Sequence, residues 1–188
     1  MARPTKVLVV GDSLSAEYGL ARGSGWVALL EQRLHKERVG ATVVNASISG
    51  DTTSGGRTRL PSLLDLHKPT HVIIELGSND ALRGLPLKMT RDNLAVMVRA
   101  ARDTGAQALL VGMRMPPNYG RSYTQEFETM FATLAKAEGA ALVPFMLAGI
   151  ADSPNASGLF QDDGLHPNAQ AQTIIFDNVW PVLRGQLR

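Results

Sequence analysis

The sequence predicts an α/β protein in which five parallel strands form one sheet between two layers of helices. Two observations support this prediction. Five short runs rich in β-branched residues or leucine recur along the chain, and segments between them carry apolar residues at helical spacing. Such alternation is typical of βαβ units, in which parallel strands are joined by right-handed crossovers. We therefore expect a three-layer α/β/α sandwich.

The predicted strands end where loops rich in glycine, proline and polar residues begin. The strands are expected at Lys6–Val10, Thr42–Ala46, His71–Leu76, Gln107–Gly112 and Ala141–Phe145. The loops that follow include SGDTTSGG, GSNDALRGLP, MRMPPNYG and SPNASG. The carboxyl ends of parallel strands share one edge of a sheet, so these loops are expected to meet there although they are distant in sequence.

Four segments between or after the strands carry an apolar face with the spacing of an α-helix, and we interpret each face as core. The faces are Trp26, Leu29, Leu30 and Leu34; Leu94, Met97, Val98 and Ala101; Phe127, Met130, Phe131 and Leu134; and Ala171, Ile174, Ile175, Val179 and Val182. The third helix is expected to begin with a capping box, with Ser122 as N-cap and Gln125 at its third position. Pro167 is expected in the first turn of the last helix.

The composition fits one soluble domain that spans residues 1–188. A chain of 188 residues with 44% hydrophobic and 19% charged residues can bury a core of its own. The net charge is +2 and the 19 basic residues form no dense run, so nucleic acid is not an expected partner. The longest nearly apolar run, residues 140–151, is too short to cross a bilayer. A monomer is favoured, and the opening MARPTK lacks the pattern of a secretion signal.

Ser13 is the candidate nucleophile. It lies in the sequence GDSLS directly after the first predicted strand, and the absence of cysteine leaves serine as the obvious nucleophile. A serine hydroxyl attacks a carbonyl group efficiently only when a base accepts its proton, which here requires a histidine. The alternative interpretation is that Ser13 belongs to an ordinary turn.

His166 is the candidate base, because it lies in the loop QDDGLHPN that leads into the last helix. Asp163 precedes it by three residues, a spacing that lets the carboxylate bind one imidazole nitrogen while the other faces the serine. Asp162 is the competing carboxylate and lies one residue farther from His166. The remaining histidines are interpreted as surface or strand-end residues: His35, His67 and His71.

Two further loops offer donors for the negative charge that develops on a carbonyl oxygen during acyl transfer. The sequence SISGDT offers the backbone N–H of Gly50, and ELGSND offers the side-chain amide of Asn79. Taken singly, the glycine also fits a tight turn and the asparagine a loop cap. Their loops are predicted at the same sheet edge as those of Ser13 and His166, which favours a shared site.

These motifs carry a family resemblance. The blocks GDSLS, SISGDT, GSND and DGLHP resemble, in order, the four blocks of the SGNH (GDSL) hydrolase family. The longer stretches VVNASISGDT, ELGSNDALRG and NYGRSY are similar to its bacterial thioesterase I, lysophospholipase and arylesterase branch. The resemblance implies a flavodoxin-like strand order and a catalytic triad of Ser13, His166 and Asp163. It also suggests a periplasmic or secreted location, and a cytoplasmic location is the alternative because the sequence shows no secretion signal.

The same resemblance implies the parts of the site that surround the triad. The oxyanion hole would consist of the N–H groups of Ser13 and Gly50 and the side chain of Asn79, and Leu82 and Met115 would border an acyl groove. No metal or organic cofactor is expected. Two positions differ from what is usual in the branch: Glu17, where glycine is usual, and Ser78, where close relatives often carry glycine.

The sequence therefore predicts a serine esterase and thioesterase that hydrolyses small-molecule acyl esters and thioesters through an acyl-enzyme. One alternative is a carbohydrate O-acetylesterase of the same family. A second alternative is a non-enzymatic flavodoxin-like module in which the serine-rich loop after the first strand binds a phosphate or a flavin. The low aromatic content of 5% and the lack of a P-loop pattern disfavour this second alternative.

Overall fold

The sheet at the centre of the protein has the five predicted parallel strands. The computed structural model describes residues 4–37 and 40–187. The strands are β1 (Lys6–Gly11), β2 (Thr42–Asn45), β3 (His71–Glu75), β4 (Gln107–Val111) and β5 (Ala141–Val143). They lie in the order β2-β1-β3-β4-β5, which is the flavodoxin-like order. Each predicted strand is confirmed, with its ends displaced by at most two residues.

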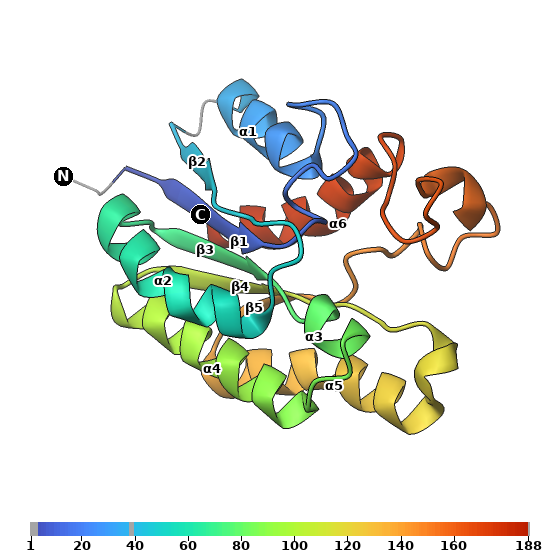
Figure 1. Ribbon diagram of the computed structural model, residues 1–188. Helices are drawn as coiled ribbons and strands as arrows, with labels where there is room; N and C mark the ends of the chain where they lie inside the picture. Colours follow the sequence, from blue (N-terminus) through green and yellow to red (C-terminus); the bar gives the residue numbers. More distant parts are fainter. Residues whose placement is uncertain (1–3, 38–39, 188) are drawn as a thin grey trace.

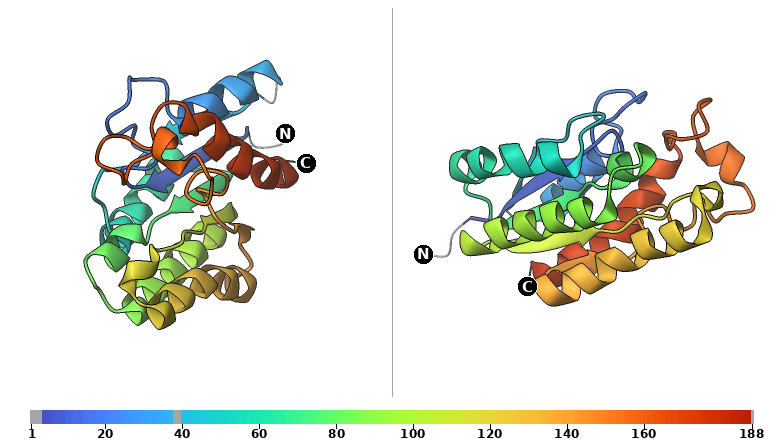
Figure 2. Two further views of the ribbon diagram at one scale, coloured as in Figure 1. Left: turned by 90° about the vertical axis from the view of Figure 1, so that its right-hand side faces the viewer. Right: turned by 60° about the horizontal axis from the view of Figure 1, so that its bottom comes forward.

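Helices cover both faces of this sheet. Helices α1 (Trp26–Lys36) and α6 (Ala171–Gln186) lie on one face, and α2 (Thr53–His67), α4 (Leu87–Asp103) and α5 (Arg121–Glu138) lie on the other (Figure 1). The same three layers are visible from two further directions (Figure 2). The three-layer α/β/α sandwich is therefore confirmed.

The core consists of the strands and the helix faces that point toward them. Residues 7–11 of β1 are all buried, as expected for a central strand that is covered on both faces. The four predicted helical faces are confirmed, because all of their residues are buried or half-buried in one apolar cluster. This core fixes the strands, and their carboxyl ends in turn fix the loops that carry the polar motifs.

Three local expectations are wrong. The segment SGDTTSGG is not entirely a loop, because α2 begins at Thr53 and includes Gly55 and Gly56. Ser122 lies inside α5, whose N-cap is Gly120, and no side chain caps that helix. Pro167 precedes α6 and pairs instead with Phe160 in an isolated bridge.

The carboxyl edge of the sheet also carries three short helices. They are α3 (Ser78–Leu82), the 3₁₀ helix η1 (Pro117–Tyr119) and the 3₁₀ helix η2 (Ala156–Leu159), and in Figure 1 they lie beyond the carboxyl ends of the strands. Within the described ranges, no helix has the length and apolar character needed to cross a membrane.

Candidate active site

The turn after β1 presents Ser13 at the carboxyl edge of the sheet. Gly11 is the last residue of the strand, and the buried Asp12 holds the turn that follows. The Asp12 carboxylate accepts the N–H of Leu14 at 2.9 Å, and its carbonyl oxygen accepts the N–H of Ser15 at 3.1 Å. The chain therefore leaves the strand in a fixed direction at Ser13.

Ser13, His166 and Asp163 form one continuous chain of hydrogen bonds. The Nε2 atom of His166 lies 3.0 Å from Ser13 Oγ, and its Nδ1 atom lies 2.6 Å from Asp163 Oδ2. With the Nδ1 proton directed to the carboxylate, Nε2 is free to accept the hydroxyl proton. The structure thus brings together three residues that the sequence places in two loops.

The Asp163 carboxylate is held in its charged form. The N–H groups of His166 and Leu165 each donate to Asp163 Oδ1 at 2.9 Å, and the imidazole donates to Oδ2. These bonds, the backbone bond from His166 first among them, lower the pKa of Asp163 from 3.8 to about 2. The competing Asp162 is exposed and has no hydrogen bond to His166 in the described part of the chain.

The other three histidines lie away from this chain of hydrogen bonds. His35 is exposed in the last turn of α1, and His67 is half-buried in the last turn of α2. His71 begins β3, where its ring contacts the Thr70 hydroxyl at 2.9 Å and the Gln186 carbonyl at 3.2 Å. Burial lowers the pKa of His71. The strand-end interpretation of His71 is confirmed, and His35 is a surface residue as expected.

Gly50 lines the same cavity as Ser13. Gly50 has a φ of +79°, a left-handed conformation that favours glycine, and its carbonyl accepts a hydrogen bond from Arg83 at 2.8 Å. Among the described residues, no acceptor contacts the N–H of Ser13 or the N–H of Gly50. Both N–H groups can therefore donate to a ligand.

The Asn79 side chain is the third predicted donor. Asn79 lies in the first turn of α3, and its amide nitrogen donates to the Asp51 carbonyl at 2.9 Å. The same nitrogen lies 3.3 Å from Asp12 Oδ2. The first bond fixes the amide, whereas the second is long and leaves its hydrogen weakly held.

A buried polar network lies beneath the Ser13 turn. The Ser15 hydroxyl donates to Glu75 Oε1 at 2.6 Å and accepts a hydrogen bond from the Trp26 indole at 3.2 Å. Glu75 is 1% exposed, and burial, together with the charge of Asp12, raises the pKa of its carboxyl group well above the usual range. Burial likewise raises the pKa of Asp12 to about 6. Sequence reasoning missed Glu75, which reads simply as the polar end of a strand.

A mostly apolar cavity of about 630 Å³ opens at this edge. The predicted Leu82 and Met115 both line it, Leu82 from the end of α3 and Met115 from the loop after β4. Its other apolar lining residues are Leu14, Tyr18, Met113, Pro116, Pro117, Phe145, Leu147, Ala151, Phe160 and Leu165. Arg114 also lines the cavity, and its guanidinium pairs with Glu128 at 2.8 Å and lies over the Phe145 ring.

Tyr18 was also missed by sequence reasoning, although it contacts the imidazole. Its ring centroid lies 4.3 Å from that of His166, and its carbonyl accepts a hydrogen bond from Gln161 at 2.8 Å. Glu17 has a φ of +60°, and its carboxylate accepts the N–H groups of Gly23 and Gly25. The unusual glutamate therefore closes the loop that carries Tyr18. The signal that the sequence offered for Tyr18 was that it is an aromatic residue in a chain with few aromatic residues.

Neither Ser78 nor the arrangement of the histidine and carboxylate side chains changes the character of the site. Ser78, the second unusual position, is the first residue of α3 and is half-buried at the cavity. Across the described residues, no cluster of three or more histidine, aspartate or glutamate side chains has the arrangement of a metal site.

The model of the GDSL-like lipase/acylhydrolase family matches residues 9–174, a range that contains all of these site residues. The chain belongs to this family. The family assignment agrees with the four sequence blocks, and the structure assembles those blocks around one cavity.

Several esterases and a thioesterase are similar in sequence to this GDSL-family protein. Esterase TesA of Pseudomonas aeruginosa is 49% identical, covering 96% of this chain and 89% of the relative. An arylesterase of Vibrio mimicus is 44% identical, covering 93% of this chain and 86% of the relative. Thioesterase 1/protease 1/lysophospholipase L1 of Escherichia coli K12 is 41% identical, covering 91% of this chain and 79% of the relative. A crystal structure of TesA superimposes with a TM-score of 0.92 at 48% identity, covering 98% of this chain and all of that one.

Proposed function

We propose that this protein is a serine hydrolase that cleaves carboxylic esters and thioesters of small acyl substrates. The observation that carries the proposal is the hydrogen-bonded chain from Ser13 Oγ through His166 to Asp163, at the mouth of a mostly apolar cavity. The family assignment and the esterase and thioesterase names of the relatives support the same reaction. A hydrolase also explains the site better than a phosphate- or flavin-binding module does.

In the first step, Ser13 Oγ attacks the carbonyl carbon of the substrate while His166 Nε2 accepts the hydroxyl proton. Asp163 stabilises the imidazolium that forms and holds its Nδ1 proton. The bond to the alcohol or thiol then breaks, and His166 gives its proton to the leaving group. The products of this step are an acyl-enzyme on Ser13 and a free alcohol or thiol.

In the second step, water attacks the acyl-enzyme. His166 accepts a proton from the water and returns it to Ser13 Oγ as the acid leaves. In both steps the N–H groups of Ser13 and Gly50 and the amide of Asn79 stabilise the oxyanion, each worth roughly 3–4 kcal/mol of barrier. The long contact from Asn79 to Asp12 is the one exchanged for the oxyanion.

The cavity favours an acyl chain over a sugar as the group that is bound. Leu82 and Met115 contribute to its apolar lining, and all groups of the proposed site come from one chain. Because all of these groups come from one chain, we infer that the site is complete in a monomer. Because the lining is mostly apolar, we infer that longer acyl chains gain binding energy from the cavity. Burial of each added methylene contributes about 0.8 kcal/mol, which corresponds to about a fourfold gain in kcat/KM.

The proposal is tested by hydrolysis of p-nitrophenyl esters and acyl-coenzyme A thioesters from acetyl to dodecanoyl. We expect kcat/KM to rise by up to about fourfold per methylene until the chain fills the cavity. Ser13→Ala should lower kcat by at least about 10⁴-fold, whereas Ser54→Ala, on the exposed side of α2, should not change it.

Full activity of the Ser13→Ala variant would contradict the proposed nucleophile. Rates that are highest for acetylated sugars and fall with chain length would instead support the O-acetylesterase alternative. Circular dichroism of the same preparation establishes that each protein is folded before its activity is compared.

A further inference from the structure

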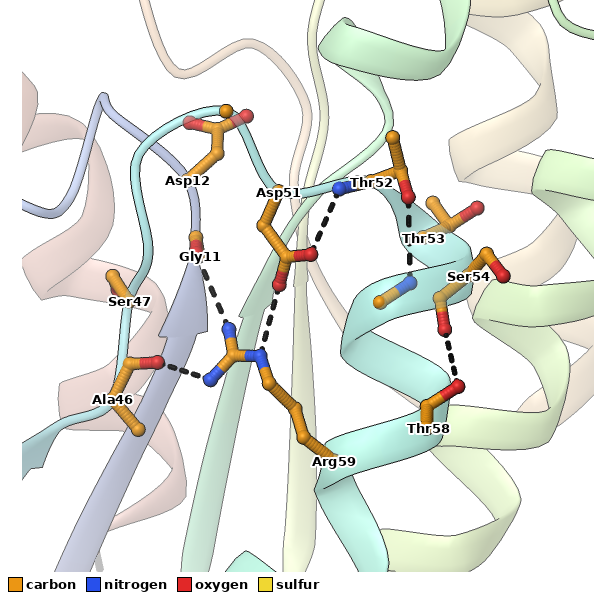
Figure 3. Close-up of polar contacts among 12 residues, drawn as sticks. Gly11, Asp12, Ala46, Ser47, Asp51, Thr52, Thr53, Ser54, Thr58 and Arg59 are labelled. Carbon is orange, nitrogen blue, oxygen red and sulfur yellow. Dashed lines mark hydrogen bonds and ion pairs between the residues drawn. The ribbon is translucent and has the colours of Figure 1, made fainter.

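Arg59 makes hydrogen bonds to three residues in two segments at the carboxyl edge of the sheet, the end of β1 and the loop from β2 to α2. It lies in α2, and its side chain is 21% exposed. Its Nε donates to Asp51 Oδ2 at 2.9 Å, one terminal nitrogen donates to the Ala46 carbonyl, and the other reaches the Gly11 carbonyl at 3.5 Å. Figure 3 shows this fork between the end of β1 and the loop that runs from β2 to α2.

Two of the three residues that Arg59 contacts, Gly11 and Asp51, lie close in sequence to donors of the proposed oxyanion hole, and Asp51 also holds a donor from another helix. Gly11 lies two residues before Ser13, and Asp51 directly follows Gly50. The carbonyl of Asp51 in turn accepts the amide of Asn79 at 2.9 Å. Arg59 is thus connected to Ser13 through Gly11 and Asp12, and to the Gly50 and Asn79 donors through Asp51.

The Asp51 carboxylate is well suited to transmit this constraint. Its side chain is 12% exposed, so its attraction to Arg59 is screened less than that of a surface ion pair. Its second oxygen accepts the N–H of Thr52 at 3.0 Å, which fixes the carboxylate at both ends. A guanidinium spreads its donors over three nitrogens in a rigid planar fork, which suits three separated acceptors, whereas the three donors of a lysine ammonium all lie on one nitrogen.

We propose that Arg59 is a positioning residue that fixes the Gly50 and Asn79 donors relative to Ser13. This inference rests on the proposed serine hydrolase function. Arg59 does not touch the substrate, because it is absent from the lining of the cavity. Its effect is on the transition state, since the donors that it orients bind the oxyanion more strongly than the ground-state carbonyl.

The test uses Arg59→Met and Arg59→Lys, with Arg91→Met as the matched control. Arg91 lies on α4, has a side chain that is about half exposed, and forms an ion pair with Asp92 at 3.9 Å. We expect Arg59→Met to lower kcat about 10- to 100-fold while KM changes less than about threefold, because misplaced donors weaken transition-state binding. Arg59→Lys keeps the charge and should recover only part of the loss. Rates are divided by the concentration of active sites, titrated with a fluorophosphonate.

The same substitution in an Asn79→Ala background separates positioning from a general structural role. If Arg59 acts through the oxyanion donors, its removal should cost less in this background than in the wild type, because one donor is already missing. Equal losses in both backgrounds, or an Arg59→Met kcat within twofold of the Arg91→Met control, would overturn the inference. If Arg59→Met does not fold, the same comparison with Arg59→Lys decides. A wild-type protein without esterase activity would instead overturn the proposed function.

Discussion

Asp162 and Asp163 are adjacent carboxylates with different surroundings, and they offer a matched test of the proposed triad. Both side chains are exposed, but Asp163 accepts three hydrogen bonds from Leu165 and His166, whereas Asp162 makes none with His166 in the described part of the chain. Asp163→Asn should lower kcat by roughly 10²- to 10⁴-fold, because an amide no longer favours the required tautomer or stabilises the imidazolium. Asp162→Asn should stay within about twofold of the wild type.

The measurement is kcat for one ester substrate with both variants in parallel. A larger loss in Asp162→Asn than in Asp163→Asn would contradict the assignment of the acid. Because hydrogen bonds lower the pKa of Asp163 to about 2, this carboxylate stays ionised at the pH of any ordinary assay, and both variants are compared with the wild type at one fixed pH.

The buried pair of Asp12 and Glu75 predicts a pH-dependent stability. Burial raises the pKa of both carboxyl groups, so the folded protein holds their protons more tightly than the unfolded chain does. Their contribution to the free energy of unfolding is therefore fully present below about pH 4. It falls as the pH rises through about 6 for Asp12, and the loss from Glu75 extends to higher pH.

Glu75→Gln removes the titrating group and keeps the oxygen that accepts the Ser15 hydroxyl. The stability of this variant relative to the wild type should rise with pH above about 4, by up to about 1.4 kcal/mol per pH unit for one proton released. Urea unfolding between pH 4 and pH 8 measures this difference. Glu31→Gln, on the exposed side of α1, is the control. Parallel stability curves for Glu75→Gln and the wild type would contradict the prediction.

Helix α2 shows why one element could not be predicted from the sequence. Its first turn contains Gly55 and Gly56, and glycine lowers helix propensity, so the segment resembles a loop. In the structure, Thr52 caps the helix by accepting the Gly55 N–H, and Thr53 is fixed by hydrogen bonds to Asp80. Tertiary contacts from α3 therefore stabilise a helix in a segment whose own residues have low helix propensity.

Replacement of Gly56 by alanine should destabilise the protein, although alanine favours a helix more than glycine does. A Cβ atom there would lie 2.3 Å from Leu76 Cδ1 and 3.0 Å from Met97 Cε, whereas a Cβ at Gly185 in α6 would meet nothing within 4 Å. Gly56→Ala should lower the free energy of unfolding by about 1–3 kcal/mol through overpacking. Gly185→Ala should raise it by up to about 1 kcal/mol. Denaturant unfolding checks both signs, and a stabilised Gly56→Ala variant would contradict the packing argument.

The strands and the four apolar helix faces were predictable because burial imposes the same periodicity on sequence and structure. The wrong N-cap at Ser122 has a different cause. Gly120 ends η1 with a φ of +91° and leads directly into α5, so the helix begins before the serine. Element boundaries depend on such turns, whose geometry the local sequence does not determine.

The molecule as a whole explains why the candidate site was more predictable than its surroundings. Parallel strands bring their carboxyl ends to one edge, so Ser13, Gly50, Asn79 and His166 could be placed together because their loops were predicted at that edge. The contacts of Tyr18, Glu75 and Arg59 could not be predicted in this way. They depend on side-chain reach between loops and helices, which no periodicity in the sequence encodes.

The central claim is that Ser13 is a nucleophile activated by His166, and covalent labelling tests it most directly. The folded protein is treated with a long-chain alkyl fluorophosphonate, in which serine attack on phosphorus releases fluoride, and the adduct is located by peptide mapping. We predict one adduct, on Ser13, that is lost in His166→Ala. An adduct at another residue, no adduct on folded protein, or equally fast labelling of His166→Ala would contradict the account.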